Sequence, residues 1–439
     1  MKTTILLSFA MLLTLMSQAT VSLTVNSIAG SLSTLITTAG GNLNTITDLT
    51  VTGTIDARDF GTMNALMPML SNLDLSSASI VEFKDKNNIY LANQMPLASF
   101  CNGATGAGKT TLKTIILPNG LTSIGGSAFR NCTGINSINL PSGITSIESA
   151  AFMGCTGITS ITFPSGFTSI GTSAFSDSGI NEFIVAEANQ NLCSLNGVVF
   201  NKNKTTLILY PSMKTGTYIV PNTVTSIGIS AFYGCTGISA LTLSSTLTSI
   251  GEHAFHGCTG ITSLTIPSGI TTIELGTFSF CSGLTSIIIP SSVSTMSNGA
   301  FFNCINLKTV YSLNAIPPNL GASCFNGTSL VTDVFVPTDA AVTAYKANTA
   351  WIAYFPGTII KKGSPSAVPT LTGSNVKVYG MGNAVIVDGT TLGETVSIYN
   401  VKGLQLATVK SQGERLTIPV KGNGIYLVKT AGKAIKVIL

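Results

Sequence analysis

Charged side chains are scarce in this sequence. Lys, Arg, Asp and Glu make up 9% of the 439 residues, against roughly 25% in an ordinary globular domain. A net charge of +5 is too small for the basic surface of a nucleic-acid-binding protein, so we expect no nucleic-acid partner. Two histidines and 17 acidic residues leave few groups for acid–base chemistry. This composition alone does not rule out an enzyme, but an enzyme would need clustered carboxylates or histidines, and the repeated part of the sequence shows none. We therefore expect no enzymatic activity, no catalytic residues and no cofactor.

Hydroxyl side chains take the place of the missing charges. The sequence has 48 Ser and 59 Thr beside 44% hydrophobic residues. A disordered chain combines low hydrophobicity with high net charge, and this composition is the opposite. The charges are also unevenly placed, because residues 361–439 carry a net +7 and residues 1–360 a net −2. This shift predicts a separate C-terminal domain.

The N-terminus has the features of an export signal. Lys2 precedes an apolar run from Ile5 to Met16, and Ser17 and Ala19 are small residues where a signal peptidase reads the chain. We interpret residues 1–19 as a secretory signal peptide. No later stretch reaches the roughly 18 uninterrupted apolar residues of a membrane span. We expect a secreted protein with no transmembrane segment after signal cleavage.

A phenylalanine recurs through the middle of the chain, mostly every 23 residues. Each unit reads approximately F-x-x-C-T-G-I-T-S-I-T-I-P-S-G-I-T-S-I-G-x-x-A. Such a period is typical of a solenoid, in which stacked units bury apolar edges that one unit cannot bury alone. The series consists of Phe129, Phe152, Phe175, Phe232, Phe255, Phe278 and Phe301, with Phe100 before it and Phe325 after it.

The copy that starts at Phe152 shows the expected geometry of one unit. Ile161 and Phe163 alternate with Thr162, so the two apolar side chains point inward and Thr162 points outward. Pro164 cannot donate a backbone hydrogen bond and ends the strand. We expect a mainly β, right-handed solenoid in which the phenylalanines form a buried aromatic stack.

Two regions depart from the regular period. Strand-like runs at 197–200 and 206–210 flank a turn signal and predict a β-hairpin that projects from the array, in an insertion at about 182–220. In residues 20–99, Asp56 is a suitable N-cap for a helix that reaches Leu70. We interpret residues 20–99 as an N-terminal capping region for the open end of the stack.

Three further patterns resemble chemical sites. Residues 103–110 match the phosphate-loop pattern GxxxxGK[ST], but no helix follows, so we expect a loop that enlarges the first repeat. His253 and His256 occupy variable repeat positions and are expected on the solvated surface, with no metal. Six cysteines share one repeat position, so the Cβ atoms of neighbouring ones would lie about 4.8 Å apart. A disulfide prefers a Cβ–Cβ distance of roughly 3.8 Å, so we expect buried free thiols. They are Cys132, Cys155, Cys235, Cys258, Cys281 and Cys304.

The outward-facing strand positions form polar rows. This flat face suits hydrogen bonding to protein backbone or to glycans, and it weakly resembles the threonine arrays of ice-binding solenoids. Alternatively, β-prone hydroxyl residues simply keep the sheet face soluble. The candidate binding face consists of Ser137, Asn139, Ser160, Thr162, Thr242, Ser263, Thr265 and Ser286, with Ala240 and Ile288 at equivalent positions.

The repeat pattern "ITSIGxxAFxGCTGITSITIPSG" resembles the BspA-like leucine-rich repeat family of bacterial surface proteins, and "LNGVVFNKNKTTLILYP" resembles an element that recurs in it. We assign residues 100–360 to these repeats. The resemblance implies a cell-surface or extracellular, adhesin-like protein that binds macromolecular partners through its repeat face, with an extracellular protein or a glycan as ligand. The alternative is a glycan-binding or structural scaffold component of the bacterial surface layer.

The last residues predict a second domain. After a linker at 361–372, short strand-like runs joined by Gly turns indicate a small antiparallel β-sandwich at 373–439. The strings "VSIYNVKG", "GIYLVK" and "KAIKVIL" resemble the type A C-terminal sorting domain of the type IX secretion system, which implies that machinery as a partner and export across an outer membrane. A sandwich used only as a folding cap is the alternative. The residues that carry the resemblance are Gly403, Gly424, Tyr426, Val428 and Lys429.

Overall fold

A computed structural model describes residues 20–363, 377–381, 384–388, 395–400, 404–410, 416–420, 425–430 and 433–438. The chain forms two compact units, residues 1–364 and 365–439. The signal-peptide prediction for residues 1–19, and the predicted linker from residue 364 onward, lie outside the described residues. Within the described ranges, no helix has the length and apolar character needed to cross a membrane.

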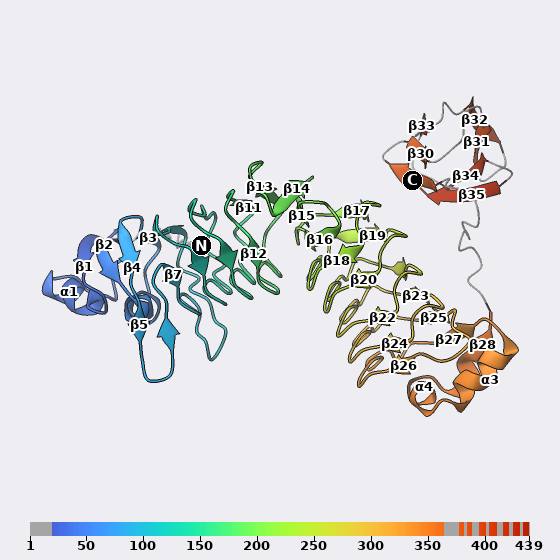
Figure 1. Cartoon of the computed structure of the whole chain (residues 1–439), viewed down its shortest axis with the longest axis horizontal. Coiled ribbons are helices and arrows are strands. Elements are labelled where there is room, and N and C mark those ends of the chain that lie inside the picture. The colour runs from blue at the N-terminus through green and yellow to red at the C-terminus, as the bar shows by residue number, and fades with distance from the viewer. Residues whose placement is uncertain are drawn as a thin grey trace, which may run out of the picture. The chain divides into compact units, whose positions relative to one another are not determined.

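The first unit is a mainly β solenoid of about 14 turns, which confirms the predicted fold class. Most turns contribute a first strand that pairs in parallel with its neighbours, about 23 residues apart. Figure 1 shows these strands stacked turn upon turn. The first strands are β1 (Ser22–Ser27), β2 (Asp48–Ile55), β3 (Asn72–Asp74), β8 (Thr114–Ile116), β11 (Ser160–Phe163), β13 (Glu182–Val185), β17 (Gly216–Ile219), β19 (Ile238–Thr242), β21 (Ser263–Thr265), β23 (Ser286–Ile289), β25 (Thr309–Ser312), β27 (Asp333–Val336) and β28 (Ile360–Lys362).

Most turns also contribute a second strand, usually of two residues, and in five turns it is the Ser-Ile pair of the repeat. These strands are β7 (Gln94–Met95), β9 (Ser123–Ile124), β10 (Ser146–Ile147), β12 (Ser169–Ile170), β16 (Thr206–Leu209), β18 (Ser226–Ile227), β20 (Ser249–Ile250), β22 (Thr272–Ile273), β24 (Thr295–Met296) and β26 (Asn319–Leu320). β4 (Ala78–Ile80) pairs with the end of β2, and β5 (Phe83–Lys84) with β6 (Ile89–Tyr90) forms a small hairpin.

The predicted aromatic stack is present in two runs. Ring centroids lie 5.2 Å apart between Phe129 and Phe152 and 5.3 Å apart between Phe278 and Phe301, with nearly parallel planes. The first run ends at Phe175, and the second begins at Tyr210, which stacks on Phe232. Each ring is buried against the apolar side chains of its own and adjacent turns. One aromatic side chain per turn therefore ties each unit to its neighbours.

The segment 182–220 corrects the prediction of a projecting hairpin. β15 (Val198–Asn201) and β16 are antiparallel as predicted, and β14 (Leu192–Leu195) adds a third strand. However, β16 pairs in parallel with β18, so this three-stranded meander is part of the stack. Val198, Val199 and Phe200 are all buried, because both faces of β15 are covered by protein. Strands β13 and β17, also inside this segment, occupy ordinary first-strand positions.

The meander divides the hydrophobic core in two. Val199 and Leu209 belong to the cluster formed by the N-terminal turns. Val198, Phe200 and Leu207 belong to the cluster formed by the C-terminal turns. Because side chains alternate across a strand, one strand can face both clusters. The meander is therefore an internal partition of the solenoid.

Helices lie near both ends of the array. At the N-terminal end, α1 (Leu32–Thr38) follows β1, and α2 (Ala57–Gly61) leads into a π-helical turn, Thr62–Leu66. Asp56 caps α2 as predicted, and Asp59 completes a capping box. In residues 20–99, strands β1, β2 and β3 pair in the same parallel manner as the first strands of the later turns.

The last turns carry helices that the repeat pattern did not predict. They are α3 (Asp339–Ala347), α4 (Thr349–Tyr354) and a 3₁₀ turn, Gly357–Ile359. Trp351 and Phe355 from this region pack against Phe325, the last ring of the stack. The helices cover an apolar surface that would otherwise lack a following repeat.

The second unit consists of two antiparallel sheets, in the orders β29-β30-β33 and β32-β31-β34-β35. Val385 from one sheet and Val396 and Val428 from the other share one buried cluster, which agrees with the predicted sandwich. The strands are β29 (Lys377–Met381), β30 (Ala384–Asp388), β31 (Thr395–Asn400), β32 (Gln405–Lys410), β33 (Leu416–Pro419), β34 (Ile425–Thr430) and β35 (Lys433–Ile438).

Candidate binding surface

The predicted binding residues lie on the first strands or at the equivalent positions of a turn, with outward side chains. Thr162 and Thr265 occupy the same position of β11 and β21, between two buried neighbours. Seven of the eight predicted residues are exposed, and Ser286 is half-buried. Register pairing places Ser263 directly beside Ser286. The sequence therefore identified one face of the array, which we call the strand face.

The strand face changes character toward the C-terminal turns. Ile288, Tyr311 and Phe335 occupy the outward position that Thr265 holds in β21. The rings of Tyr311 and Phe335 stack with centroids 5.1 Å apart, and both side chains are half-buried. The binding face predicted from the sequence ended at Ile288. Counting one further period of 23 residues and one of 24 would have found the two aromatic residues.

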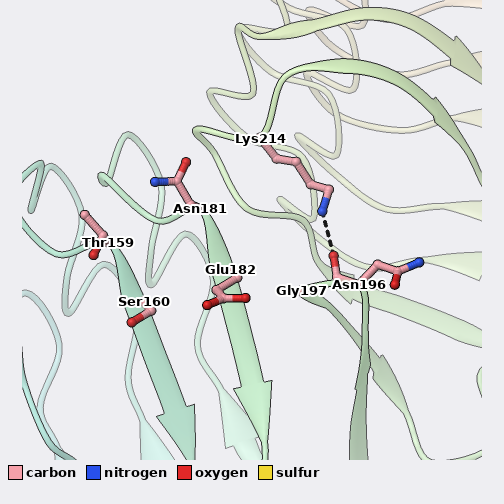
Figure 2. A pocket seen from close by; sticks show the side chains of 7 residues that line it. All are labelled: Thr159, Ser160, Asn181, Glu182, Asn196, Gly197 and Lys214. Carbon is pink, nitrogen blue, oxygen red and sulfur yellow. Dashed lines mark hydrogen bonds between the residues drawn. The ribbon is translucent and has the colours of Figure 1, made fainter. Parts of the chain in front are cut away.

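A polar pocket lies where the first strands are interrupted between β13 and β17. Its volume is about 540 Å³, and Figure 2 shows the side chains that line it. One wall comes from the start of β11 and β13, and the opposite wall from the tip of the β14–β15 hairpin and from Lys214. We call it the junction pocket, and it is lined by Thr159, Ser160, Asn181, Glu182, Asn196, Gly197 and Lys214. Only Ser160 among these was predicted.

Backbone and side-chain hydrogen bonds hold the pocket walls. The Phe183 N–H donates to the Gly197 carbonyl at 2.9 Å, which fixes the hairpin tip against β13. The Lys214 ammonium donates to the Asn196 carbonyl at 2.6 Å. The Glu182 carboxylate has no hydrogen bond or ion pair to any of the described residues. The pocket therefore presents one free acceptor group and one cation with donors to spare.

The cysteine ladder is confirmed as buried free thiols. All nine cysteines are unpaired, and the six repeat cysteines are buried. Cys155 Sγ donates to the Phe129 carbonyl at 2.9 Å, and Cys304 Sγ donates to the Phe278 carbonyl at 3.0 Å. Each thiol thus satisfies a carbonyl of the preceding turn. Burial raises the pKa of Cys132 and Cys281 to about 12, which makes these thiols unreactive.

The prediction of solvated histidines is wrong. His253 and His256 are both half-buried, because the turns stack closely enough to cover them. His256 stacks on Tyr233 with centroids 4.2 Å apart, and its Nδ1 lies 2.6 Å from Ser279 Oγ. Burial and the neighbouring His253 lower the pKa of His256 to about 4. No group of three metal-ligating side chains occurs within the described ranges.

The phosphate-loop pattern forms the expected loop. Lys109 is 7% exposed, and its ammonium donates to the Asn64 carbonyl at 3.3 Å and to the Met67 carbonyl at 2.7 Å. Burial lowers its pKa. The lysine that would contact phosphates therefore points into the protein, where it closes the π-helical turn of the N-terminal region.

Three of the five sorting-motif residues fall within the described segments. Tyr426 and Val428 contribute to the core of the second unit, whereas Lys429 is exposed. Gly403 and Gly424 lie outside the described residues.

The repeats match a known family. Residues 107–206 and 208–332, just over half of the chain, match the family described as "BspA type Leucine rich repeat region" in six copies. The chain belongs to the BspA-type leucine-rich repeat family. No curated protein is similar to it in sequence.

Solved structures of this repeat type share the fold. A leucine-rich cell surface protein from Faecalibacterium prausnitzii is 21% identical with a TM-score of 0.51, and the match covers 73% of this chain and 85% of that one. The pneumococcal vaccine antigen PcpA is 19% identical with a TM-score of 0.53, covering 72% of this chain and 78% of that one. At these identities the likeness establishes the BspA-type solenoid and nothing finer.

Proposed function

We propose that this chain is a secreted, surface-displayed protein that binds macromolecular partners, in the manner of an adhesin, through its strand face. The observation that carries the proposal is the weakly charged row of outward side chains, exposed at its start and half-buried toward its C-terminal end, that extends from Ser137 to Phe335. An extended array of this kind suits a large partner, because repeat proteins bind through such continuous surfaces. Family membership and the cell-surface description of the Faecalibacterium protein support surface display.

An extracellular protein is the partner class that the C-terminal part of the face favours. Ile288 and the stacked pair Tyr311 and Phe335 provide apolar contact area next to polar rows. Protein interfaces are enriched in such aromatic side chains. The hydroxyl-rich turns around Thr162 and Thr242 favour the second candidate, a glycan-binding or scaffolding component of the surface layer.

Charged substitutions on the strand face should weaken partner binding. We expect Thr162→Lys and Thr265→Lys in the full-length protein to lower binding to extracellular-matrix protein arrays by roughly tenfold or more, because each buries an unpaired ammonium. Thr156→Lys and Thr259→Lys are matched controls, since these exposed residues lie in the same repeats but off the strands. Equal losses in both pairs would contradict the site, and a hit on a parallel glycan array would favour the second candidate.

The same experiment has a second readout. Few charges lie on the strand face, so affinity should change by less than about threefold between low and high salt. A steep loss of affinity on adding salt would place binding elsewhere. If the folded protein binds to neither the protein array nor the glycan array, a structural role at the cell surface would be the better explanation.

We further propose that the second unit directs export by a type IX secretion system. Its two antiparallel sheets and the sequence strings that end the chain support this. Deleting residues 373–439 should keep the protein inside the outer membrane of a host with this system, as measured by cell fractionation. The point variant Lys429→Ala, at an exposed position, tests the motif without removing the fold. Normal surface delivery of the deleted protein would contradict the proposal.

A further inference from the structure

The junction pocket has the size of a small-molecule site but an unusual lining. Its volume of about 540 Å³ lies within the range of roughly 300–1,000 Å³ for ligand pockets. Six polar side chains and one glycine line it, with no apolar side chain. An apolar ligand would therefore gain little from binding there, since the lining offers little apolar surface to bury against it.

The two charges of the pocket argue against a simple ion as ligand. Glu182 and Lys214 lie on opposite walls and are not within ion-pair distance of each other (Figure 2). A phosphate attracted to Lys214 would face the Glu182 carboxylate. A divalent cation attracted to Glu182 would find a single carboxylate and a nearby ammonium, whereas calcium takes six to eight oxygen ligands. The lining is net neutral.

We propose that the junction pocket binds a neutral sugar unit. Each sugar hydroxyl both donates and accepts hydrogen bonds, which matches a lining that offers both. The Glu182 carboxylate accepts, the Lys214 ammonium keeps two donors beyond its bond to Asn196, and the amides of Asn181 and Asn196 do both. Hydrogen bonds to the charged groups would supply most of the affinity, because such bonds are about twice as strong as neutral ones.

The walls are already held in place before a ligand arrives. The hairpin tip is bonded to β13 through Phe183 and Gly197, and Lys214 is bonded to Asn196. A preformed site loses less conformational entropy on binding. The site lies at the irregular turn of the solenoid, where the meander separates β13 from β17. The inference does not rest on partner binding by the strand face, with which the pocket shares only Ser160.

The test uses the full-length protein with D-glucose, D-galactose, D-mannose and N-acetylglucosamine as probes, and glucuronate and glucosamine as charged counterparts. Saturation-transfer NMR identifies binding, and a titration gives Kd. We expect at least one neutral sugar to bind more tightly than either charged sugar. Glu182→Ala and Lys214→Met should each weaken that binding by about tenfold or more. Glu187→Ala and Lys308→Met are matched controls at exposed positions outside the pocket and should change nothing.

Several results would overturn the proposal. They are no binding of any probe, preference for a charged sugar, or unchanged binding in Glu182→Ala when circular dichroism shows it to be folded. Thr265→Lys should leave sugar binding intact while it weakens binding to the arrays, which separates this site from the strand face. If the corresponding trisaccharide binds more tightly than the single sugar, the natural ligand is a glycan chain. If the two bind equally well, the natural ligand is a free sugar. Both results agree with the proposal.

Discussion

The free energy of unfolding should fall steeply as the pH rises above about 9. The cause is the ladder of buried thiols, since burial disfavours the thiolate. The pKa of Cys132, Cys281 and Cys324 is raised from the usual value of 9.0 to about 12, and burial raises the pKa of Cys155, Cys235, Cys258 and Cys304 as well.

The sign follows from proton binding. Between pH 9 and pH 12 the unfolded thiols lose their protons while the folded thiols keep them, so the folded state binds more protons and stability decreases with pH. The stabilisation is fully present below pH 9. Once the unfolded thiols are deprotonated, each buried thiol lowers the free energy of unfolding by about 1.4 kcal/mol per pH unit. Seven such thiols together lower it by about 10 kcal/mol per pH unit, whereas a whole domain is stable by only about 5–15 kcal/mol. The lowered pKa of Lys109 acts in the opposite direction but is a single group.

Urea unfolding followed by circular dichroism at pH 7, 9 and 10.5, with a reductant present, would measure this effect. A Cys258→Ala/Cys281→Ala variant should lose somewhat more than a quarter of the thiol contribution to the alkaline slope, because two of the seven buried thiols no longer titrate. Cys193→Ala is the matched control, since Cys193 is only half-buried. An alkaline slope that is the same in all three proteins would show that the thiols are not responsible.

Truncating one ring of the aromatic stack should cost far more stability than truncating a ring outside it. Phe278 is 2% exposed and stacks on Phe255 and Phe301, with centroids 5.4 and 5.3 Å away. We expect Phe278→Ala to lower the free energy of unfolding by about 3–5 kcal/mol, the cost of a large cavity in a core. Because neighbouring turns share each ring, the loss should extend to both adjacent repeats.

Phe280 provides the control two residues away. It is 44% exposed and has a φ of 58°, at a position that three other turns fill with glycine (Gly154, Gly234 and Gly257). Phe280→Gly removes a ring but also relieves an unfavourable backbone conformation, so its net effect should stay within about 1 kcal/mol. Thermal and urea unfolding of the two variants under one set of conditions would measure the difference. Similar losses for both would refute a special role of the stack.

The regular part of the fold could be predicted because the same sequence pattern recurs in each turn. The period of 23 residues defined the strand positions, the stacked rings and the thiol ladder, each many times over. The N-cap at Asp56 could be predicted from local chemistry alone, since its side chain bonds within its own turn.

The irregular parts could not be predicted, because they depend on contacts between segments with no repeated pattern. The sequence of the meander has the same strand-like pattern whether the strands project from the solenoid or cross its core. The burial of both faces of β15 shows that they cross the core. Glu182, Asn196 and Lys214 come from three segments of one irregular turn and form a pocket only after it folds. The prediction for His256 was wrong because aromatic residues of the two adjacent turns, Tyr233 and Phe280, pack against its ring.

The partition formed by β14, β15 and β16 has a consequence for how the array comes apart. Repeat arrays unravel from their ends, because each turn is held only by its neighbours. Unfolding that starts at β28 can proceed turn by turn through the C-terminal hydrophobic cluster until it reaches β15. Val199 of β15 still packs against the N-terminal cluster at that point. If mechanical pulling or an extracellular protease removes the C-terminal half, the N-terminal half should therefore stay folded, with β15 covering its hydrophobic core.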